Sequence, residues 1–364
     1  MDRSAIKSDF LDPGADTGSG PRVRRQRRKM QRVTMMDVAR QAGVSPSTVS
    51  LYLRRPDAVS PTAGQEIAQA IEALGYVPNL VAGGLAAAGS RVVSVIVPSI
   101  RNAFFAETVA SLQTELAAEG LQVMLGHSEY SESDEEALIR TALAWAPAAI
   151  VLTGLSHSKA ARKLLTSSGV PVVEMWELGP HAPVDMAVGF SHTAVGATAA
   201  RHFAQQGFTR LAFLGARLSQ DRRAAARAEG FVAEAVRLGL PEPQIINHPA
   251  PATAEAGAQL LGRVQANLPR LQAVACSNDL IALGVLFECQ RRGVTVPSDL
   301  AVIGFGDLSF SSTSNPPLTT IRPSGDLIGR EVARLIKACV HGNRPPEAER
   351  IVDTGHLLVE RKSG

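Results

Sequence analysis

Small hydroxyl side chains are concentrated at one short stretch of the chain. Four of the six residues from 45 to 50 carry a hydroxyl group: Ser45, Ser47, Thr48 and Ser50. Such hydroxyls, together with the free amides of a helix N-terminus, donate hydrogen bonds to phosphate oxygens and base edges. The stretch therefore predicts contact with nucleic acid, and an ordinary helical hairpin is the alternative interpretation.

The charge distribution favours the same chemistry. Residues 22 to 60 contain ten arginines and lysines but only two aspartates, whereas the whole chain has a net charge of +3. A basic block on a near-neutral chain is typical of a phosphate-binding segment. Residues 1–32 are predicted to be a disordered basic tail. The arginine-rich run within it is interpreted equally well as a solvated segment or as an arm that contacts DNA.

Two short helices around a tight turn would position the hydroxyls. Apolar residues recur at helical spacing over 38–42, and Gly43 is a typical residue after a helix C-terminus. Ser45 is expected to cap a second helix that begins at Pro46. This pattern predicts a helix-turn-helix, which places its second helix in the major groove.

A third helix is predicted to begin at Ser60 and to end at Gly75. It completes a small all-α head over residues 33–77. The following segment, 78–90, is rich in glycine and alanine and predicts a linker or a marginal hinge helix.

From residue 91 onward, strand and helix patterns alternate, and the rhythm restarts at about residue 185. Alternation of this kind predicts parallel, doubly wound sheets with helices on both faces. Two such blocks predict a two-lobed α/β core over 91–364, shaped like a periplasmic binding protein. A ligand would lie between the lobes, at the carboxyl ends of the strands. The expected lobes are 91–189 with 322–341, and 190–321 with 342–364.

Composition narrows the classes of protein. The three cysteines are widely spaced and form no CxxC or His–Cys cluster, so neither a disulfide framework nor a metal site is expected. No 18-residue apolar run and no secretory signal is recognisable, which favours the cytoplasm and excludes a membrane partner. The chain has no Ser-His-Asp order, no GxGxxG after a strand and no P-loop. We therefore expect neither an enzyme nor a bound cofactor.

Several motifs resemble those of the lactose-repressor (LacI/GalR) family of bacterial transcription regulators. They are DVARQAGVSPSTVS, LGYVPN at 74–79, RAEGF at 227–231, SNDLIALG at 277–284 and NPPLTTI at 315–321. The core also resembles the gluconate-repressor branch through PVVE, MAVGF and FECQRRG. The resemblance implies an allosteric repressor on the bacterial nucleoid, a homodimer that reads a near-palindromic operator. No heptad pattern follows the last strand, so a dimer is expected rather than a coiled-coil tetramer.

The resemblance also implies roles for residues of the head and hinge. The positions that face bases fall on Pro46, Ser47 and Leu51, and the family commonly has an arginine where Leu51 stands. Arginine reads guanine with two hydrogen bonds, whereas leucine can touch only apolar groups such as a thymine methyl. Leu85 matches a leucine that enters the minor groove. The residues predicted to contact DNA are Thr34, Ser45, Pro46, Ser47, Thr48, Ser50, Leu51, Arg54, Ala82 and Leu85.

In the core, the resemblance places Arg227 in the cleft between the lobes. Gly306 stands where the family has an aspartate that grips sugar hydroxyls, and Asp279 is expected to cap a helix. The residues predicted to contact the effector are Ser99, Arg101, Phe104, Thr153, Phe190, Arg227, Asn278 and Gly306. Weaker candidates are His157, Trp176, Arg222 and Arg223.

A pocket that keeps the arginine but lacks the carboxylate is more positive by one charge. Because arginine binds carboxylates bidentately, we expect a small acidic effector such as gluconate or a related sugar acid. Alternatively, Gly306 only relieves backbone strain and the effector is a neutral sugar. A solute-binding protein with the same two-lobed shape is the rival outside transcription, and the basic head argues against it.

Overall fold

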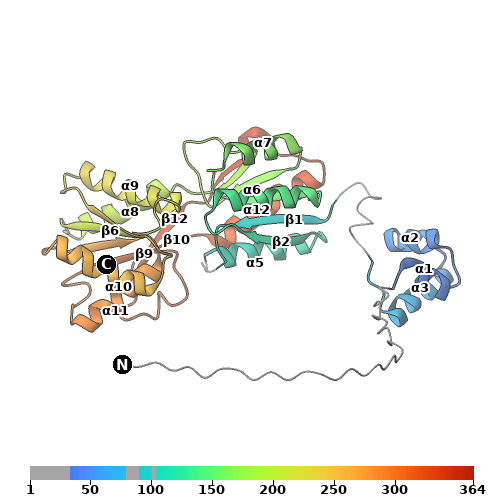
Figure 1. Ribbon diagram of the computed structural model, residues 1–364, viewed down its shortest axis with the longest axis horizontal. Coiled ribbons are helices and arrows are strands. Elements are labelled where there is room, and N and C mark those ends of the chain that lie inside the picture. Colours follow the sequence, from blue (N-terminus) through green and yellow to red (C-terminus); the bar gives the residue numbers. More distant parts are fainter. Residues whose placement is uncertain (1–32, 79–89, 101–103) are drawn as a thin grey trace, which may run out of the picture. The chain divides into compact units, whose positions relative to one another are not determined.

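The computed structural model describes residues 33–78, 90–100 and 104–364, which form parts of two compact units divided near Gly83 (Figure 1). The predicted tail at 1–32 lies outside the described residues. So does most of the predicted hinge, including Ala82 and Leu85, and so does Arg101.

The head consists of α1 (Met35–Gln41), α2 (Pro46–Arg54), the 3-10 turn η1 (Pro56–Ala58) and α3 (Pro61–Leu74). Local sequence accounts for where these helices begin and end. The hydroxyls of Thr34, Ser45 and Ser60 each accept a hydrogen bond from a first-turn amide, and Gly75 follows α3 in a left-handed conformation. A small core holds the helices together, and its buried members are Val38, Ala39, Ala42, Val49, Ile67 and Ala70.

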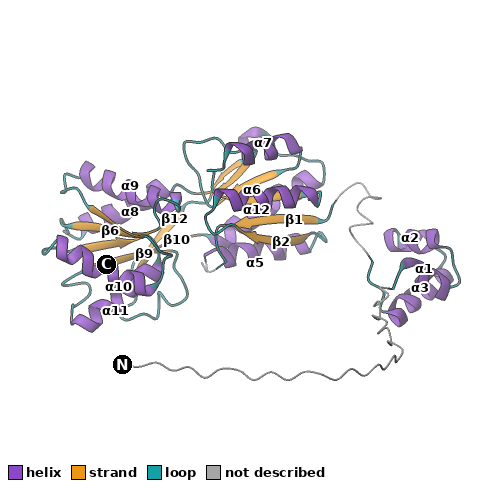
Figure 2. Cartoon of the chain, in the orientation of Figure 1, coloured by secondary structure: helices purple, strands orange, loops and turns teal. Residues whose placement is uncertain are grey.

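The core unit contains two six-stranded sheets (Figure 2). The first has the strand order β11-β5-β4-β3-β1-β2 and the second has the order β12-β10-β9-β8-β6-β7. All neighbouring strands run parallel except β10 and β12. The first sheet comprises β1 (Val92–Val97), β2 (Gln122–His127), β3 (Ala149–Thr153), β4 (Val172–Met175), β5 (Met186–Gly189) and β11 (Ile351–Asp353). The second comprises β6 (Leu211–Ala216), β7 (Gln244–His248), β8 (Ala273–Cys276), β9 (Ala301–Phe305), β10 (Thr319–Pro323) and β12 (His356–Val359).

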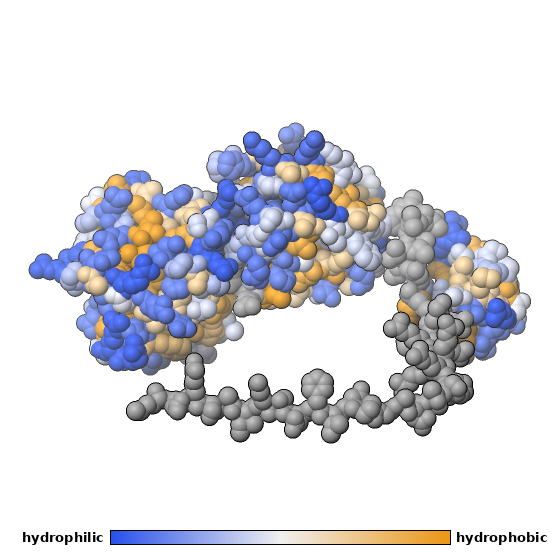
Figure 3. Space-filling model, viewed as in Figure 1, coloured by the Kyte–Doolittle hydropathy of each residue, from blue (hydrophilic) through white to orange (hydrophobic). Residues whose placement is uncertain are grey.

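Helices cover both faces of each sheet, as the alternating pattern predicted. In the first lobe α5 (Phe104–Ala117) packs beside α12 (Gly325–Val340), and α6 (Glu132–Ala144) beside α7 (Lys159–Ser168). In the second lobe α8 (His192–Gln205) packs beside α9 (Arg222–Arg237), and α10 (Ala254–Asn267) beside α11 (Asp279–Arg292). Central strands such as β3 and β9 are buried along their whole length, which explains their uninterrupted apolar sequences. In Figure 3, hydrophilic residues (blue) surround smaller hydrophobic patches (orange) on the visible face of both lobes.

Three segments of the described chain cross between the lobes. They lie between β5 and α8, between β10 and α12, and between β11 and β12. The last crossing differs from the expected boundary after residue 341, because Ile351–Asp353 pairs with β5 in the first sheet. The middle crossing also comes later than expected, since β10 ends at Pro323 in the second sheet. In the described part of the chain, no helix is long and apolar enough to cross a membrane.

Candidate DNA-binding surface and effector site

The N-terminus of α2 carries a compact network of hydroxyls. Ser45 Oγ accepts from the amide of Thr48 at 3.1 Å and lies 2.7 Å from Ser47 Oγ and 2.8 Å from Thr48 Oγ1. Ser45, Pro46 and Ser47 are exposed, whereas Thr48 and Ser50 are half-buried. The cap therefore orients two neighbouring hydroxyls at the exposed end of the helix that the sequence predicts to read DNA.

The other predicted contacts of the head surround this helix. Thr34 caps α1, and its hydroxyl donates to Asp37 Oδ2 at 2.6 Å. This bond, with a second one from the Thr34 amide, lowers the pKa of Asp37. Leu51 is half-exposed, and Arg54 is exposed with its Nε donating to the Ser50 carbonyl at 3.1 Å. Their contacts with DNA remain predictions.

In the core unit, Arg227 lies on α9 and is 94 % buried, with a relative exposure of 6 %. Its Nη1 donates to His192 Nδ1 at 3.0 Å, and its Nη2 donates to the Ser277 carbonyl at 2.7 Å. The guanidinium carbon lies 4.0 Å from the centre of the Phe305 ring. Among the described residues, Nε has no hydrogen-bond partner and no carboxylate lies within ion-pair distance of the guanidinium.

Burial disfavours the charged form of Arg227. Burial is the main cause that lowers the pKa of Arg227 to about 10; the charge of Asp221 opposes this shift, and the neighbouring Arg223 adds to it. Burial also lowers the pKa of His192 well below its usual value, and the positive charge of Arg227 acts in the same direction. His192 is therefore neutral at neutral pH, so that of this hydrogen-bonded pair only Arg227 is charged.

Arg227 reaches this position because two helices approach closely. A Cβ built on Gly196 of α8 would lie only 2.0 Å from the carbonyl oxygen of Arg227 on α9. Any side chain at residue 196 would therefore push α9 away from α8 and separate Arg227 from His192.

Aromatic rings from both lobes surround the arginine. We call Phe104, Trp176, Phe190, His192 and Phe305 the inter-lobe cluster. The ring centres of Phe104 and Phe305 are 5.9 Å apart, and those of Phe190 and His192 are 4.7 Å apart. Trp176 lies 5.9 Å from Phe190, centre to centre. The structure thus brings together three predicted residues, Phe104, Phe190 and Arg227, where the carboxyl ends of strands from both sheets meet.

Gly306 joins the same group and has a steric reason to be glycine. Its φ is +124°, a conformation that L side chains rarely adopt, and an added Cβ would lie 1.9 Å from Phe104 Cε1. The next residue, Asp307, forms ion pairs with Arg361, at 2.7 Å, and with Arg322. Glycine at residue 306 therefore meets a backbone and a steric requirement, and the adjacent carboxylate of Asp307 is already paired with two cations.

The remaining predicted effector residues lie nearby but are engaged differently. Asn278 is buried, and its Oδ1 caps α11 by accepting from the Ile281 amide at 3.0 Å. Thr153 ends β3, and its hydroxyl donates to the Ile96 carbonyl at 3.3 Å. Ser99 is buried after β1 and donates to Glu129 at 3.4 Å.

The interpretation of Asp279 as a helix cap is wrong. Asn278 is the cap, and Asp279 lies fully buried at the first position of α11. Its carboxylate accepts from Thr320 Oγ1 at 2.6 Å and from the Leu308 amide and Ser311 Oγ at 2.8 Å. Asp279 thus holds α11 to β10 and to the loop after β9.

Two arginines considered as additional anion contacts instead connect the lobes. Arg222 Nη2 lies 2.9 Å from Glu132 Oε1 on α6, and Arg223 Nη1 donates to the Thr153 carbonyl at 3.2 Å. Both arginines come from the start of α9 in the second lobe, and both partners belong to the first. Their side chains therefore fasten the lobes beside Arg227.

His157 belongs to a separate buried network in the first lobe. Its Nδ1 lies 2.7 Å from Glu135 Oε1 and its Nε2 lies 3.1 Å from Glu174 Oε1. Burial lowers the pKa of His157, but the hydrogen bonds and charges of Glu135 and Glu174 outweigh burial and raise it to about 9. The cation is thus already neutralised, which indicates a structural role.

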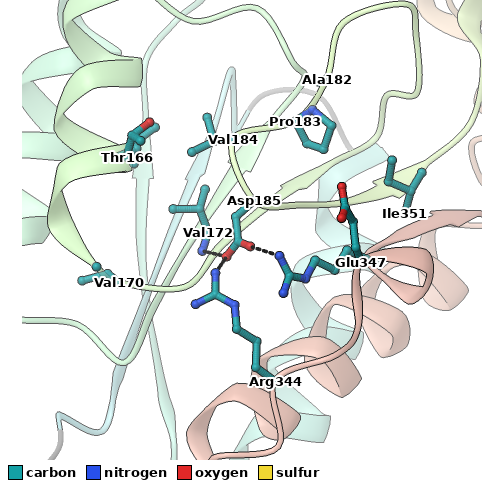
Figure 4. Close-up of a pocket in the computed structure, with 13 residues that line it drawn as sticks. Thr166, Val170, Val172, Ala182, Pro183, Val184, Asp185, Arg344, Glu347 and Ile351 are labelled. Atoms are coloured by element: carbon teal, nitrogen blue, oxygen red, sulfur yellow. Dashed lines mark hydrogen bonds and ion pairs between the residues drawn. The ribbon is translucent and has the colours of Figure 1, made fainter.

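A cavity of about 420 Å³ opens at the opposite end of the first lobe (Figure 4). Asp185 lies at its centre, where it accepts from the Val172 amide at 3.3 Å and pairs with Arg344 at 2.7 Å. Asp185 and Val172 stand at the amino ends of β5 and β4. The cavity is therefore far along these strands from the inter-lobe cluster and contains none of the predicted effector residues.

Sequence reasoning missed His192 and Phe305 as parts of the site. The sequence did contain an indication for His192. It is the first residue of the helix that follows the strand ending at Gly189, and ligand sites of parallel sheets lie at such strand ends. The described residues include no group of three or more His, Cys, Asp or Glu side chains arranged to hold a metal ion.

Comparison with known proteins places the chain among transcription regulators. Residues 34–79 match the family described as bacterial regulatory proteins, lacI family, and residues 200–363 match a periplasmic binding protein-like domain. The HTH-type transcriptional regulator GntR of Pseudomonas aeruginosa is 38% identical over 333 residues, which cover 91% of this chain and 96% of that protein. The GntR regulator of Escherichia coli K12 is 32% identical over 330 residues, covering 91% and 98%.

A solved structure agrees with these relatives. The crystal structure of a LacI-family transcriptional regulator from Silicibacter pomeroyi has a TM-score of 0.85 and 30% identity, and the match covers 91% of this chain and 99% of that one. The chain therefore belongs to the lacI family of bacterial regulatory proteins, as a DNA-binding transcriptional regulator with an effector-binding core.

Proposed function

We propose that this regulator represses genes of sugar-acid metabolism and that a small acidic effector controls its affinity for DNA. The effector binds between the lobes, with its carboxylate on Arg227. One observation carries the proposal: the guanidinium is buried, its Nε has no partner in the described part of the chain, and both of its acceptors there are neutral groups. A buried charge without a counterion is unfavourable, and an anionic ligand would supply that counterion.

The groups around Arg227 favour an anion over a neutral sugar. Asp307 is the carboxylate that follows Gly306, and it is paired with Arg322 and Arg361 rather than free to grip hydroxyls. Hydrogen bonds from arginine to a carboxylate are about twice as strong as those between neutral groups. The names of the two GntR relatives and the resemblance to the gluconate-repressor branch support the same class of effector.

The head supplies the DNA contacts in this proposal. The exposed hydroxyls at the start of α2 and the exposed Arg54 suit phosphates and base edges, and Leu51 suits a thymine methyl. A regulator that binds the chromosome acts in the cytoplasm. Regulation of transcription needs no catalytic group, so we assign the core to binding rather than to an enzyme reaction.

Two edge strands support a homodimer. β2 pairs only with β1, and β7 pairs only with β6, so each ends its sheet. Each exposes an apolar residue: Leu125 is 46% exposed and Ile245 is 43% exposed. An unpaired strand edge with exposed apolar side chains is a template for contact with another chain, and we assign the second copy to the β2 and β7 edges. A second copy of the chain, paired about a two-fold axis, would place two heads on a near-palindromic operator.

Calorimetry on the full chain tests the effector. Gluconate, 2-ketogluconate and 6-phosphogluconate are compared with glucose, first on the unmodified protein and then on R227Q. We expect at least one acid to bind and glucose not to bind, and R227Q to weaken the acid at least about 100-fold.

The matched control is R237Q, which removes an exposed arginine from the same helix. Arg237 pairs with Glu234 and lies outside the inter-lobe cluster, so acid binding should be unchanged. Binding of glucose alone would support the neutral-sugar alternative. Binding of an acid with the same affinity by R227Q would remove Arg227 from the site.

A further inference from the structure

A continuous series of four buried hydrogen bonds starts at Arg227 and ends at the first residue of α12. It runs from Arg227 to His192, then to the backbone of Trp176, and from the Trp176 indole through Thr108 to Gly325. We call these five residues the buried relay. Each of them is buried.

The first half of the relay fixes the tautomer of His192. Its Nε2 lies 2.9 Å from the Trp176 carbonyl oxygen, which can only accept, so Nε2 carries the proton. Nδ1 of the neutral ring must then accept the bond from Arg227 Nη1 at 3.0 Å. His192 can therefore bond to both neighbours only while it is neutral and in this orientation.

The second half has an equally fixed direction. The indole Nε1 of Trp176 can only donate, and it does so to Thr108 Oγ1 at 3.1 Å. The Thr108 hydroxyl must then donate its own proton to the Gly325 carbonyl, at 2.9 Å. No other rotamer of the Thr108 hydroxyl bonds to both partners. A movement of the Trp176 indole would therefore also disturb the hydrogen bond to the Gly325 carbonyl.

The relay reaches two of the three segments that cross between the lobes. His192 begins α8 immediately after the crossing from β5, and Gly325 begins α12 immediately after the crossing from β10. Between them, Trp176 has a φ of +69°, a strained conformation for a bulky residue that persists only where its surroundings hold it. The relay therefore joins the arginine of the second lobe to both crossings through a strained residue of the first.

We propose that the buried relay positions Arg227 and couples effector binding to the angle between the lobes. This inference rests on the proposed function, because it takes the effector carboxylate to bind at Arg227. A carboxylate that draws the guanidinium toward itself weakens the bond to His192. His192 then turns, the Trp176 carbonyl loses its donor, and the change passes through Thr108 to the start of α12.

Thr108 is a positioning residue in this scheme, and it allows a nearly isosteric test. T108V keeps the shape of the side chain but cannot accept from Trp176 or donate to Gly325. Two control variants lie on the same helix. S111A removes a hydroxyl that also links α5 to α12, by donating to the Asp326 carbonyl at 3.0 Å, but that lies outside the relay. T114V removes a hydroxyl that bonds only within α5, to the Ala110 carbonyl at 2.9 Å.

Two quantities are measured for each variant. Calorimetry gives the affinity for gluconate in the absence of DNA, and fluorescence anisotropy gives the affinity for a duplex selected by the unmodified protein, with and without saturating gluconate. At saturating gluconate, we expect the effector-induced change in DNA affinity to be at least about tenfold smaller for T108V than for the unmodified protein. S111A and T114V should keep the full change, and T108S, which restores the hydroxyl, should recover it.

Tryptophan fluorescence gives an independent readout. The chain contains two tryptophans, and Trp145 is 50% exposed whereas Trp176 is buried. In W145F, gluconate should change the emission of Trp176, and adding T108V should remove most of that change. If T108V does not fold, W176F removes the indole that donates to Thr108 Oγ1. The affinities of W176F for gluconate and for DNA then decide the same question.

The outcomes separate the two proposals. If the unmodified protein binds none of the acids, the proposed effector class is wrong. The relay proposal is then wrong as well, because it takes an effector carboxylate to bind at Arg227. If gluconate binds and T108V responds on DNA as fully as the unmodified protein, the relay is wrong and the effector site stands. Equal loss of response in S111A and T108V would assign the effect to the α5–α12 contact in general and would also overturn the relay.

Discussion

The ring of Phe104, from the first lobe, occupies the space that a side chain at Gly306, from the second lobe, would need. Its Cε1 lies 1.9 Å from where a Cβ on residue 306 would stand. Phe104 also packs against Phe305, with 5.9 Å between ring centres. The two lobes can touch here only because residue 306 has no side chain. Where the family has an aspartate, this chain has a glycine against which the Phe104 ring packs.

Replacing Gly306 by alanine should weaken both folding and effector binding. The φ of +124° is unfavourable for alanine, and the added methyl collides with Phe104, so we expect a loss of about 1–3 kcal/mol of unfolding free energy. Because Phe104 must withdraw, acid affinity should fall at least about tenfold. Urea unfolding and calorimetry measure the two effects.

Gly179 provides the control for this substitution. It has no atom within 4 Å of a built Cβ and no positive φ. G179A should therefore leave both quantities nearly unchanged. An effector affinity for G306A equal to that of G179A would show that the contact between Phe104 and Gly306 does not shape the site.

The His157 network predicts a stability that depends on pH. Its pKa is raised to about 9 in the folded chain from an ordinary 6.5, so the folded state holds the proton more tightly. The stabilisation is fully present below about pH 6.5 and is lost as the pH rises toward 9, with a total of up to about 3 kcal/mol. Urea unfolding at pH 6 and at pH 9.5 should show this decrease.

H157Q should lose most of that decrease, because glutamine does not titrate. The control is H341Q: His341 also faces a glutamate, with Nε2 3.5 Å from Glu119 Oε2, but its side chain is 54% exposed. H341Q should keep the pH dependence of the unmodified chain. A decrease of the same size in H157Q would mean that other groups cause it.

Features of the fold that depend on neighbouring residues in the chain could be predicted from sequence. Ser45 and Gly75 mark helix ends because their side chain or backbone acts within one turn. The alternation of strand and helix patterns was also predictable, because strands such as β1 and β9 are largely apolar and the faces of a parallel sheet are buried. Arg227 was placed by the motif around it.

Features that depend on distant residues were missed. Asp279 resembles a cap in sequence, yet its partners Ser311 and Thr320 lie 32 and 41 residues further along the chain. Likewise, β11 has only three residues and no fully buried side chain, so no local pattern shows that it joins the first sheet. The bond between His192 and Arg227 spans 35 residues and depends on how α8 packs on α9.

A charge on the edge strand β7 should disrupt the proposed dimer. Ile245 is 43% exposed, so I245R should leave the fold of the chain intact while it prevents an apolar contact with a second copy. We expect sedimentation velocity to show a shift toward monomer. Operator affinity should fall at least about 100-fold, because two heads no longer bind together.

The control for I245R is L357R, on β12 at the opposite edge of the same sheet. Leu357 lies on the edge away from the contact proposed for the second copy, so L357R should leave the dimer intact in sedimentation velocity. If L357R dissociates and I245R does not, the dimer uses the other edge of the core. If neither dissociates, the edge strands do not form the interface.

Leu51 predicts an operator that differs from the one typical of the family. It is half-exposed on α2, three residues before Arg54, and can contact only apolar groups of a base. L51R adds a side chain that reads guanine bidentately, so duplexes selected from a random library should gain a guanine at one position of each half-site. Affinity for the duplex selected by the unmodified protein should fall by about 1–3 kcal/mol.

The control L51M keeps an apolar contact and should select the original sequence. Salt dependence gives a second measure. If the arginine of L51R contacts a phosphate instead of a base, log affinity should fall more steeply with log salt, by about one unit of slope, and no new base preference should appear. Selection of the same half-site by L51R, L51M and the unmodified chain, at the same salt slope, would place residue 51 away from the DNA. The head would then read its operator through the hydroxyls of Ser45 and Ser47 and the charge of Arg54 alone.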